Sequence, residues 1–104
     1  RKAEYHLAAV IASNFPVALA YLSQRLYTDI GFPEELSRKV ISKLFESVSQ
    51  NIASKNLKNA LTGPVKRRDW EVVKQEGKIF SEYFPEFFEL YDILVKLLKK
   101  LNEQ

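Results

Sequence analysis

The sequence predicts an all-α protein, a bundle of four to five helices. Three glycines and four prolines in 104 residues leave little material for turns, and few turns imply a few long elements. Apolar residues recur every three to four positions over most of the chain, as in amphipathic helices. Hydrophobic residues make up 46% and charged residues 28%, as in an ordinary folded domain with a sizeable core. We therefore expect residues 1–104 to form a single helical domain.

The first predicted helix runs from about Lys2 to Thr28 and ends at Gly31, a residue suited to the position after a helix. Pro16 lies inside this helix and removes one backbone hydrogen bond, so we expect a kink near Ser13 or Asn14. Its apolar residues form more than one narrow stripe. Such a helix is buried on most sides, and another subunit is expected to cover one of them.

The second predicted helix begins after Pro33, with Glu34 and Glu35 in its first turn, and ends near Ser54. Its apolar positions follow helical spacing. Residues 55–66 are expected to be irregular, because Thr62-Gly63-Pro64 is a typical turn sequence.

Asp69 is the predicted N-cap of a third helix, which contains Gly77 in its interior and ends at Pro85. Pro85 also opens the last predicted helix. Three lysines near the end of that helix suit its negative C-terminal pole: Lys96, Lys99 and Lys100.

Composition excludes several classes of site. The chain has no cysteine, which rules out disulfides, thiolate metal sites and a cysteine nucleophile, and no metal site is predicted. It also has no methionine and begins at Arg1, so we expect it to be a piece of a longer protein. The uncharged stretch 7–22 is shorter than the roughly 20 residues that span a bilayer, and its Pro16 is unusual in a signal peptide. A membrane partner is therefore not expected.

Four polar residues on the first helix could line one edge of a cleft. At about 100° per residue, His6 lies one turn from Lys2 and faces nearly the same way as Ser13, while Asn14 is within reach of a shared ligand. Histidine can transfer a proton near neutral pH, and asparagine can hold a carbonyl or hydroxyl group. The alternative is that His6 and Asn14 are polar groups of a helix–helix interface and that Lys2 is merely solvated.

The segment 62–69 suggests an anion site. Gly63 and Pro64 shape a rigid turn, Thr62 offers a hydroxyl, and the basic residues that follow offer donors for a carboxylate or phosphate. The segment leads into a helix N-terminus, which also favours anions. A rigid loop and helix cap with solvated basic side chains would explain the same residues.

Two sets of residues, read together, resemble the signature segments of a known domain. The first set is Tyr5-His6 with Ala12-Ser13-Asn14. The second set is Ala60-Leu61-Thr62-Gly63-Pro64 with Arg67 and Asp69. That domain is the helical C-terminal domain, of unknown function, of Rossmann-type NADP-dependent oxidoreductases. These proteins are similar in layout to pyrroline-5-carboxylate reductase and 6-phosphogluconate dehydrogenase. Arg68 departs from the pattern, since a small residue, usually glycine, is expected there.

The resemblance implies a cytoplasmic homodimer formed through the long first helix. NADP would be bound mainly by the protein's own N-terminal Rossmann domain, with no cofactor on the helical fragment alone, and a small-molecule substrate would occupy a cleft between the domains. His6 and Asn14 are the candidate catalytic residues. The candidate substrate-binding residues are Ser13, Thr62, Gly63 and Arg67. The fragment itself lacks a G-x-G-x-x-G loop and is not expected to catalyse a reaction.

The alternative function is a stand-alone helical interaction module. In its nucleic-acid version, Lys66, Arg67 and Arg68 form a basic patch near Trp70. The net charge is only +3, and 13 acidic residues are spread among the basic ones, so nucleic-acid binding is not expected.

Overall fold

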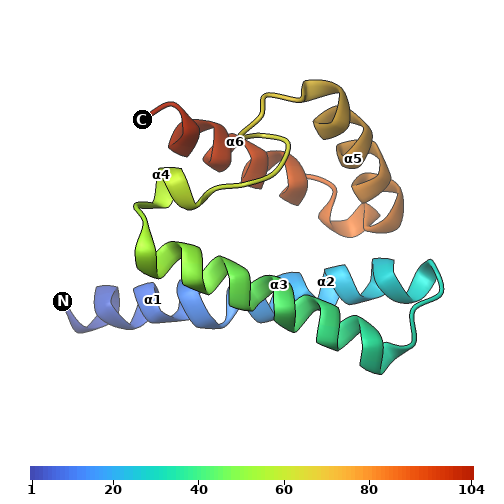
Figure 1. Cartoon of the computed structure of the whole chain (residues 1–104), viewed down its shortest axis with the longest axis horizontal. Helices are drawn as coiled ribbons and strands as arrows, with labels where there is room; N and C mark the ends of the chain where they lie inside the picture. The colour runs from blue at the N-terminus through green and yellow to red at the C-terminus, as the bar shows by residue number, and fades with distance from the viewer. The chain divides into compact units, whose positions relative to one another are not determined.

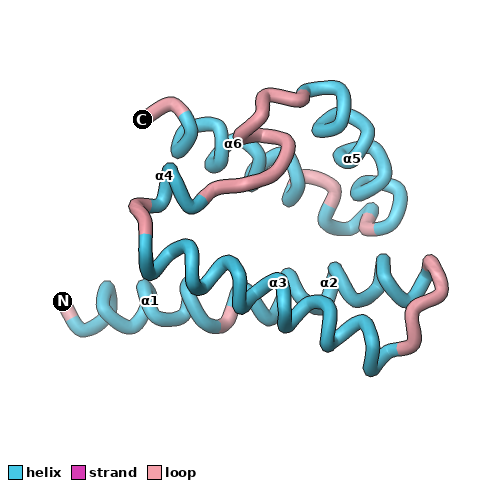
Figure 2. Tube along the Cα trace, viewed as in Figure 1, coloured by secondary structure: helices cyan, strands magenta, loops and turns pink.

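The structure, a computed structural model, describes all residues from 1 to 104 and contains helices and loops but no strand (Figures 1 and 2). The prediction of an all-α fold is confirmed. The helices of at least 12 residues are α1 (Lys2–Ser13), α2 (Phe15–Asp29), α3 (Glu34–Ser54), α5 (Trp70–Tyr83) and α6 (Leu90–Asn102). Two short elements accompany them, α4 (Leu57–Ala60) and the 3-10 helix η1 (Pro85–Phe87). The chain groups into two compact units, residues 1–47 and 48–104.

The predicted break in the first helix is confirmed, and it separates α1 from α2 at Asn14. Pro16 has no N–H to donate to Ala12, and it occupies the first turn of α2, where that loss is tolerated. The Ser13 hydroxyl donates to the carbonyl of Ala9 at 2.6 Å, a bond that commonly bends helices.

The turn between α2 and α3 also follows the prediction. Gly31 has φ +108°, its N–H donates to Thr28, and the N–H of Phe32 donates to Tyr27. This is the Schellman arrangement, which requires a left-handed residue after the helix and so explains the glycine. The rings of Tyr27 and Phe32 then pack with centroids 5.1 Å apart.

Ser37 is the most deeply buried residue of the first unit. Its hydroxyl donates to the carbonyl of Glu34 at 2.6 Å and accepts the amide of Gln24 from α2 at 3.4 Å. A buried hydroxyl without partners would be costly, so these two bonds stabilise the join between α2 and α3.

In the second unit, α5 and α6 pack through aromatic rings. Phe80 lies 5.0 Å from Phe84 and 5.9 Å from Tyr91, and the Tyr91 hydroxyl donates to Glu76 at 3.0 Å. A Cβ on Gly77 would stand 3.3 Å from the Tyr91 ring. The glycine inside α5, which costs about 1 kcal/mol of helix propensity, therefore allows this close approach of α6.

Two boundaries differ from the prediction. Residues 55–66 are not wholly irregular, because Asn56 caps the short α4 by accepting a bond from the N–H of Asn59 at 2.9 Å. The last helix begins at Leu90, because the chain after Pro85 first forms one 3-10 turn. Asp69 is confirmed as the N-cap of α5.

The buried core is smaller than the one expected for a chain of this length. Only Ile41, Val65 and Phe84 are buried among the apolar residues, while about half of the large apolar side chains stay exposed. On α1 and α2 these include Tyr5 at 82%, Val17 at 66% and Tyr21 at 75%. Soluble monomers rarely expose so much contiguous apolar surface.

The helical run Lys2–Asp29 is, by length and mean hydropathy of 1.4, long and apolar enough to cross a membrane, and none of its most apolar stretch is buried. Core helices of soluble proteins and signal sequences meet the same measure. The absence of a membrane partner stays a prediction.

Candidate functional site

His6 lies in the middle of α1 with an exposed side chain that forms no hydrogen bond or ion pair. Ser13 follows it by seven residues, two turns and about 10 Å along the same face. The imidazole is therefore free to meet a ligand or a partner. Lys2, one turn before it, is exposed as well.

Ser13 and Asn14 are in direct contact at the break between α1 and α2. The Asn14 amide Nδ2 donates to the Ser13 hydroxyl at 3.2 Å, while that hydroxyl donates its proton to Ala9. The one hydroxyl proton of Ser13 is therefore used within the helix, and substrate binding by Ser13 stays a prediction. The carbonyl oxygen of Asn14 remains available as an acceptor.

The loop 61–69 is held in place by Val65, which is only 3% exposed. Its carbonyl accepts bonds from the Arg68 N–H at 3.1 Å and from the Asn102 amide of α6 at 3.4 Å. Gly63 has φ +91°, a left-handed conformation that favours glycine. Thr62 and Arg67 are exposed at the two ends of this turn, as a shared ligand would require.

Three main-chain N–H groups at the end of this loop are engaged within the fold. The N–H groups of Arg67, Arg68 and Asp69 donate to Gly63, Val65 and Pro64, respectively. The Asp69 carboxylate accepts from Val72 N–H at 3.4 Å and already places a negative charge at the start of α5. The predicted contribution of this helix N-terminus to an anion site stays a prediction.

The two sets of predicted residues belong to different units. His6, Ser13 and Asn14 are in residues 1–47, whereas Thr62, Gly63 and Arg67 are in residues 48–104. Each set thus lies within one unit. Their meeting in one cleft stays a prediction.

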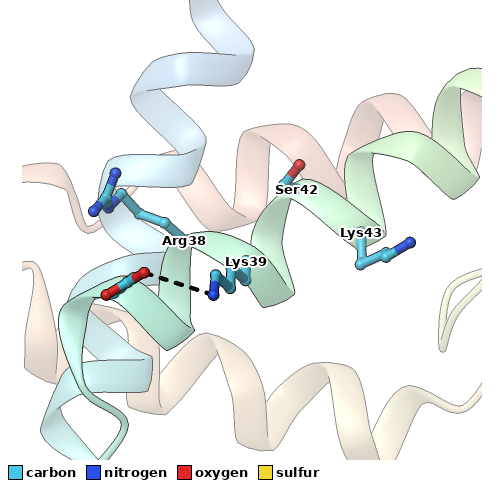
Figure 3. Close-up of a pocket in the computed structure, with 5 residues that line it drawn as sticks. Arg38, Lys39, Ser42 and Lys43 are labelled. Atoms are coloured by element: carbon cyan, nitrogen blue, oxygen red, sulfur yellow. Dashed lines mark ion pairs between the residues drawn. The ribbon is translucent and has the colours of Figure 1, made fainter.

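A cavity of about 420 Å³ lies on α3, and most of the residues that line it are charged. It is lined by Glu35, Arg38, Lys39, Ser42 and Lys43, drawn in Figure 3. Lys39 pairs with Glu35 at 3.6 Å, and the other two bases lie within 4.0 Å of Glu34 and Glu46. These exposed pairs neutralise one another, so the cavity has no charge left for a ligand.

Sequence reasoning missed a second, more apolar cavity of about 450 Å³ between α2 and α3. Val17, Ala20 and Tyr21 line it from α2 and Ile41 and Phe45 from α3, with Gln24, Arg38 and Ser42 at its polar positions. Helical periodicity placed these apolar residues on faces but could not show that the two faces leave a space between them. No group of three or more histidine, aspartate or glutamate residues is placed to hold a metal ion.

Comparison with known families gives a match that spans nearly the whole chain. Residues 1–98 match DUF2520, a domain of unknown function. The chain belongs to the DUF2520 family. No curated protein matches this DUF2520 domain.

Two solved structures resemble the DUF2520 domain. Protein TM1727 from Thermotoga maritima is 50% identical and superposes with a TM-score of 0.88 over 96% of the domain. The putative NADP oxidoreductase BF3122 from Bacteroides fragilis is 24% identical, with a TM-score of 0.80 over 97%. The domain spans only 39% and 37% of those two chains. The domain therefore shares its fold with a part of these two longer chains, one of which is described as a putative NADP oxidoreductase.

Proposed function

We propose that the DUF2520 domain is the dimerising and cleft-lining part of an NADP-dependent oxidoreductase that acts on a small molecule. The observation that carries this proposal is the likeness in fold to BF3122, described as a putative NADP oxidoreductase, of whose chain the domain spans 37%. The other part of such an enzyme, a Rossmann domain of the same protein, would bind the dinucleotide.

The residues of this domain do not themselves fit NADP. A Rossmann site needs a strand, a glycine-rich turn and a helix N-terminus, and these 104 residues have no strand and three widely separated glycines. When bound by the Rossmann domain, the reduced dinucleotide NADPH would supply the hydride. The helical domain contributes the substrate side of the cleft.

His6 is the candidate for proton transfer, because its imidazole is exposed and unpaired, and histidine can give or take a proton near neutral pH. Asn14 would orient the reacting carbonyl, imine or hydroxyl group with its amide. Thr62 and Arg67, next to the left-handed Gly63, would hold a polar or anionic group elsewhere on the substrate. Ser13 would act mainly by positioning Asn14.

The proposed homodimer is supported by the exposed apolar surface of α1 and α2. Residues 7–22 carry no charge, and Val17 and Tyr21 are largely exposed. The hydrophobic effect, about 25 cal/mol per Å² of apolar surface buried, favours covering such a surface with a second copy.

The test uses the full-length protein and begins with the coding sequence upstream of Arg1. A Rossmann domain with its G-x-G-x-x-G turn is expected there. NADPH oxidation is then measured against a panel of small carbonyl and imine compounds. His6→Ala and Arg67→Ala should each lower turnover by about tenfold or more, with the oligomeric state unchanged.

Lys66→Ala is the matched control for Arg67→Ala, because Lys66 is an exposed base in the same loop. Its turnover should equal that of the wild type. Wild-type kinetics in both His6→Ala and Arg67→Ala would refute the assigned site. A coding sequence without any Rossmann domain would refute the oxidoreductase proposal itself.

A further inference from the structure

A cavity of about 350 Å³ in the second unit lies outside the proposed substrate cleft. It forms where the residues that lead into α5 meet the C-terminal end of α6. Its lining residues are Arg68, Trp70, Lys99, Asn102 and Glu103. Thr62, Gly63 and Arg67 do not line it, so what it binds is independent of the proposed function.

Both cations of this cavity lack an acidic partner. Neither Arg68 nor Lys99 lies within 4.0 Å of a carboxylate, in contrast to the paired bases on α3. The Lys99 ammonium is instead 4.7 Å from the centre of the Trp70 ring, a weak cation–π contact at an exposed site. Because Glu103 is the only acidic residue of the lining, the cavity carries a net charge of +1, which attracts an anion.

Arg68 is held in a strained backbone conformation. Its φ is +58°, the only positive φ of a non-glycine residue in the chain. This conformation costs an arginine about 1 kcal/mol more than a glycine. The bonds of the Arg68 and Asp69 N–H groups to Val65 and Pro64 impose it, so a glycine would suit the backbone better. The arginine side chain is therefore the feature that needs an explanation.

The remaining lining groups restrict the ligand. Asn102 donates its amide to Val65 and offers its carbonyl oxygen, and Glu103 presents a carboxylate. Both are acceptors, and they suit hydroxyl groups rather than further negative charge. The neighbouring Asp69 carboxylate is engaged in capping α5.

We propose that this cavity binds a small compound that carries one phosphate group and hydroxyl groups. The guanidinium of Arg68 and the ammonium of Lys99 bind the phosphate, and Asn102 and Glu103 accept bonds from hydroxyls. The volume is at the lower end of the range for small-molecule sites, which fits a compound of about the size of a sugar phosphate.

The fluorescence of Trp70 can report ligand binding, because Trp70 is the only tryptophan of residues 1–104 and contacts the Lys99 ammonium. Inorganic phosphate and glucose 6-phosphate are titrated into the protein at constant ionic strength, with chloride as the balancing anion. The emission of Trp70 is obtained by subtracting the signal of a Trp70→Phe variant. A saturable change is expected with both phosphate compounds, with tighter binding of the sugar phosphate.

Arg68→Gly and Lys99→Ala should each weaken binding tenfold or more, because each removes a charge-assisted hydrogen bond. Lys66→Ala, which removes a base outside the cavity, should bind as the wild type does. Arg68→Gly should also unfold at the same or a higher urea concentration than the wild type, since it relieves the positive φ. Loss of binding together with retained stability separates a ligand-binding role of Arg68 from a structural one.

The proposal is overturned by a change in emission that chloride reproduces, by the lack of any saturable change, or by unaltered binding in Arg68→Gly. None of these results bears on His6 or Arg67, so the failure of this site and the failure of the proposed oxidoreductase cleft are distinguishable.

Discussion

Raising the pH above 10 is predicted to weaken the contact between α5 and α6 through Tyr91. Burial, then the hydrogen bond to Glu76, and then the negative charges of Glu76 and Asp92 raise the pKa of Tyr91 from 10.0 to about 12. The folded state thus holds the tyrosine proton more tightly than the unfolded state does. The stabilisation is fully present below pH 10 and is lost as the pH rises from 10 towards 12.

The difference of about 2 units between the two pKa values corresponds to about 3 kcal/mol at most, at 1.36 kcal/mol per unit. Tyr91 is only half-buried, and solvent screens the neighbouring carboxylates, so we expect about 1 kcal/mol or less. Removing the hydroxyl in Tyr91→Phe abolishes this pH-dependent contribution. It leaves the ring contacts with Phe80 and Gly77 in place.

The assay is urea unfolding at about pH 8 and about pH 11, monitored by the circular dichroism signal of the helices. The other tyrosines and the lysines titrate in both proteins, so their effects cancel in the comparison. The wild type should lose more unfolding free energy between the two pH values than Tyr91→Phe does, by up to about 1 kcal/mol. Equal losses in the two proteins would show that Tyr91 titrates normally and would refute the reasoning.

Two further predictions concern the core and the exposed helices. Phe84→Ala should lower the free energy of unfolding by about 3 kcal/mol or more. The reason is that Phe84 is 5% exposed and belongs to the aromatic cluster of the second unit. A urea midpoint within error of the wild type would contradict this prediction. Val17→Asp should convert the proposed dimer to monomers in sedimentation experiments, because Val17 is 66% exposed on the uncharged surface. Lys43→Asp on α3 is its control, and a dimeric Val17→Asp would show that this surface is not the interface.

The sequence by itself determined the helices and most of their ends. Local chemistry decides these features: Pro16 breaks the first helix, Gly31 ends α2 in a Schellman turn, and Asp69 caps α5. Each depends on a few neighbouring residues, so each can be read before any packing is known. The signature segments likewise indicated the DUF2520 family.

The tertiary structure alone decided which polar groups are available. The proton of Ser13 and the N–H groups of Arg67, Arg68 and Asp69 are used within the fold, which the sequence could not show. Arg68 and Lys99, 31 positions apart, line one cavity only because α6 packs beside that loop. Contacts between distant residues depend on how helix faces meet in space, and helical periodicity specifies the face but not its partner.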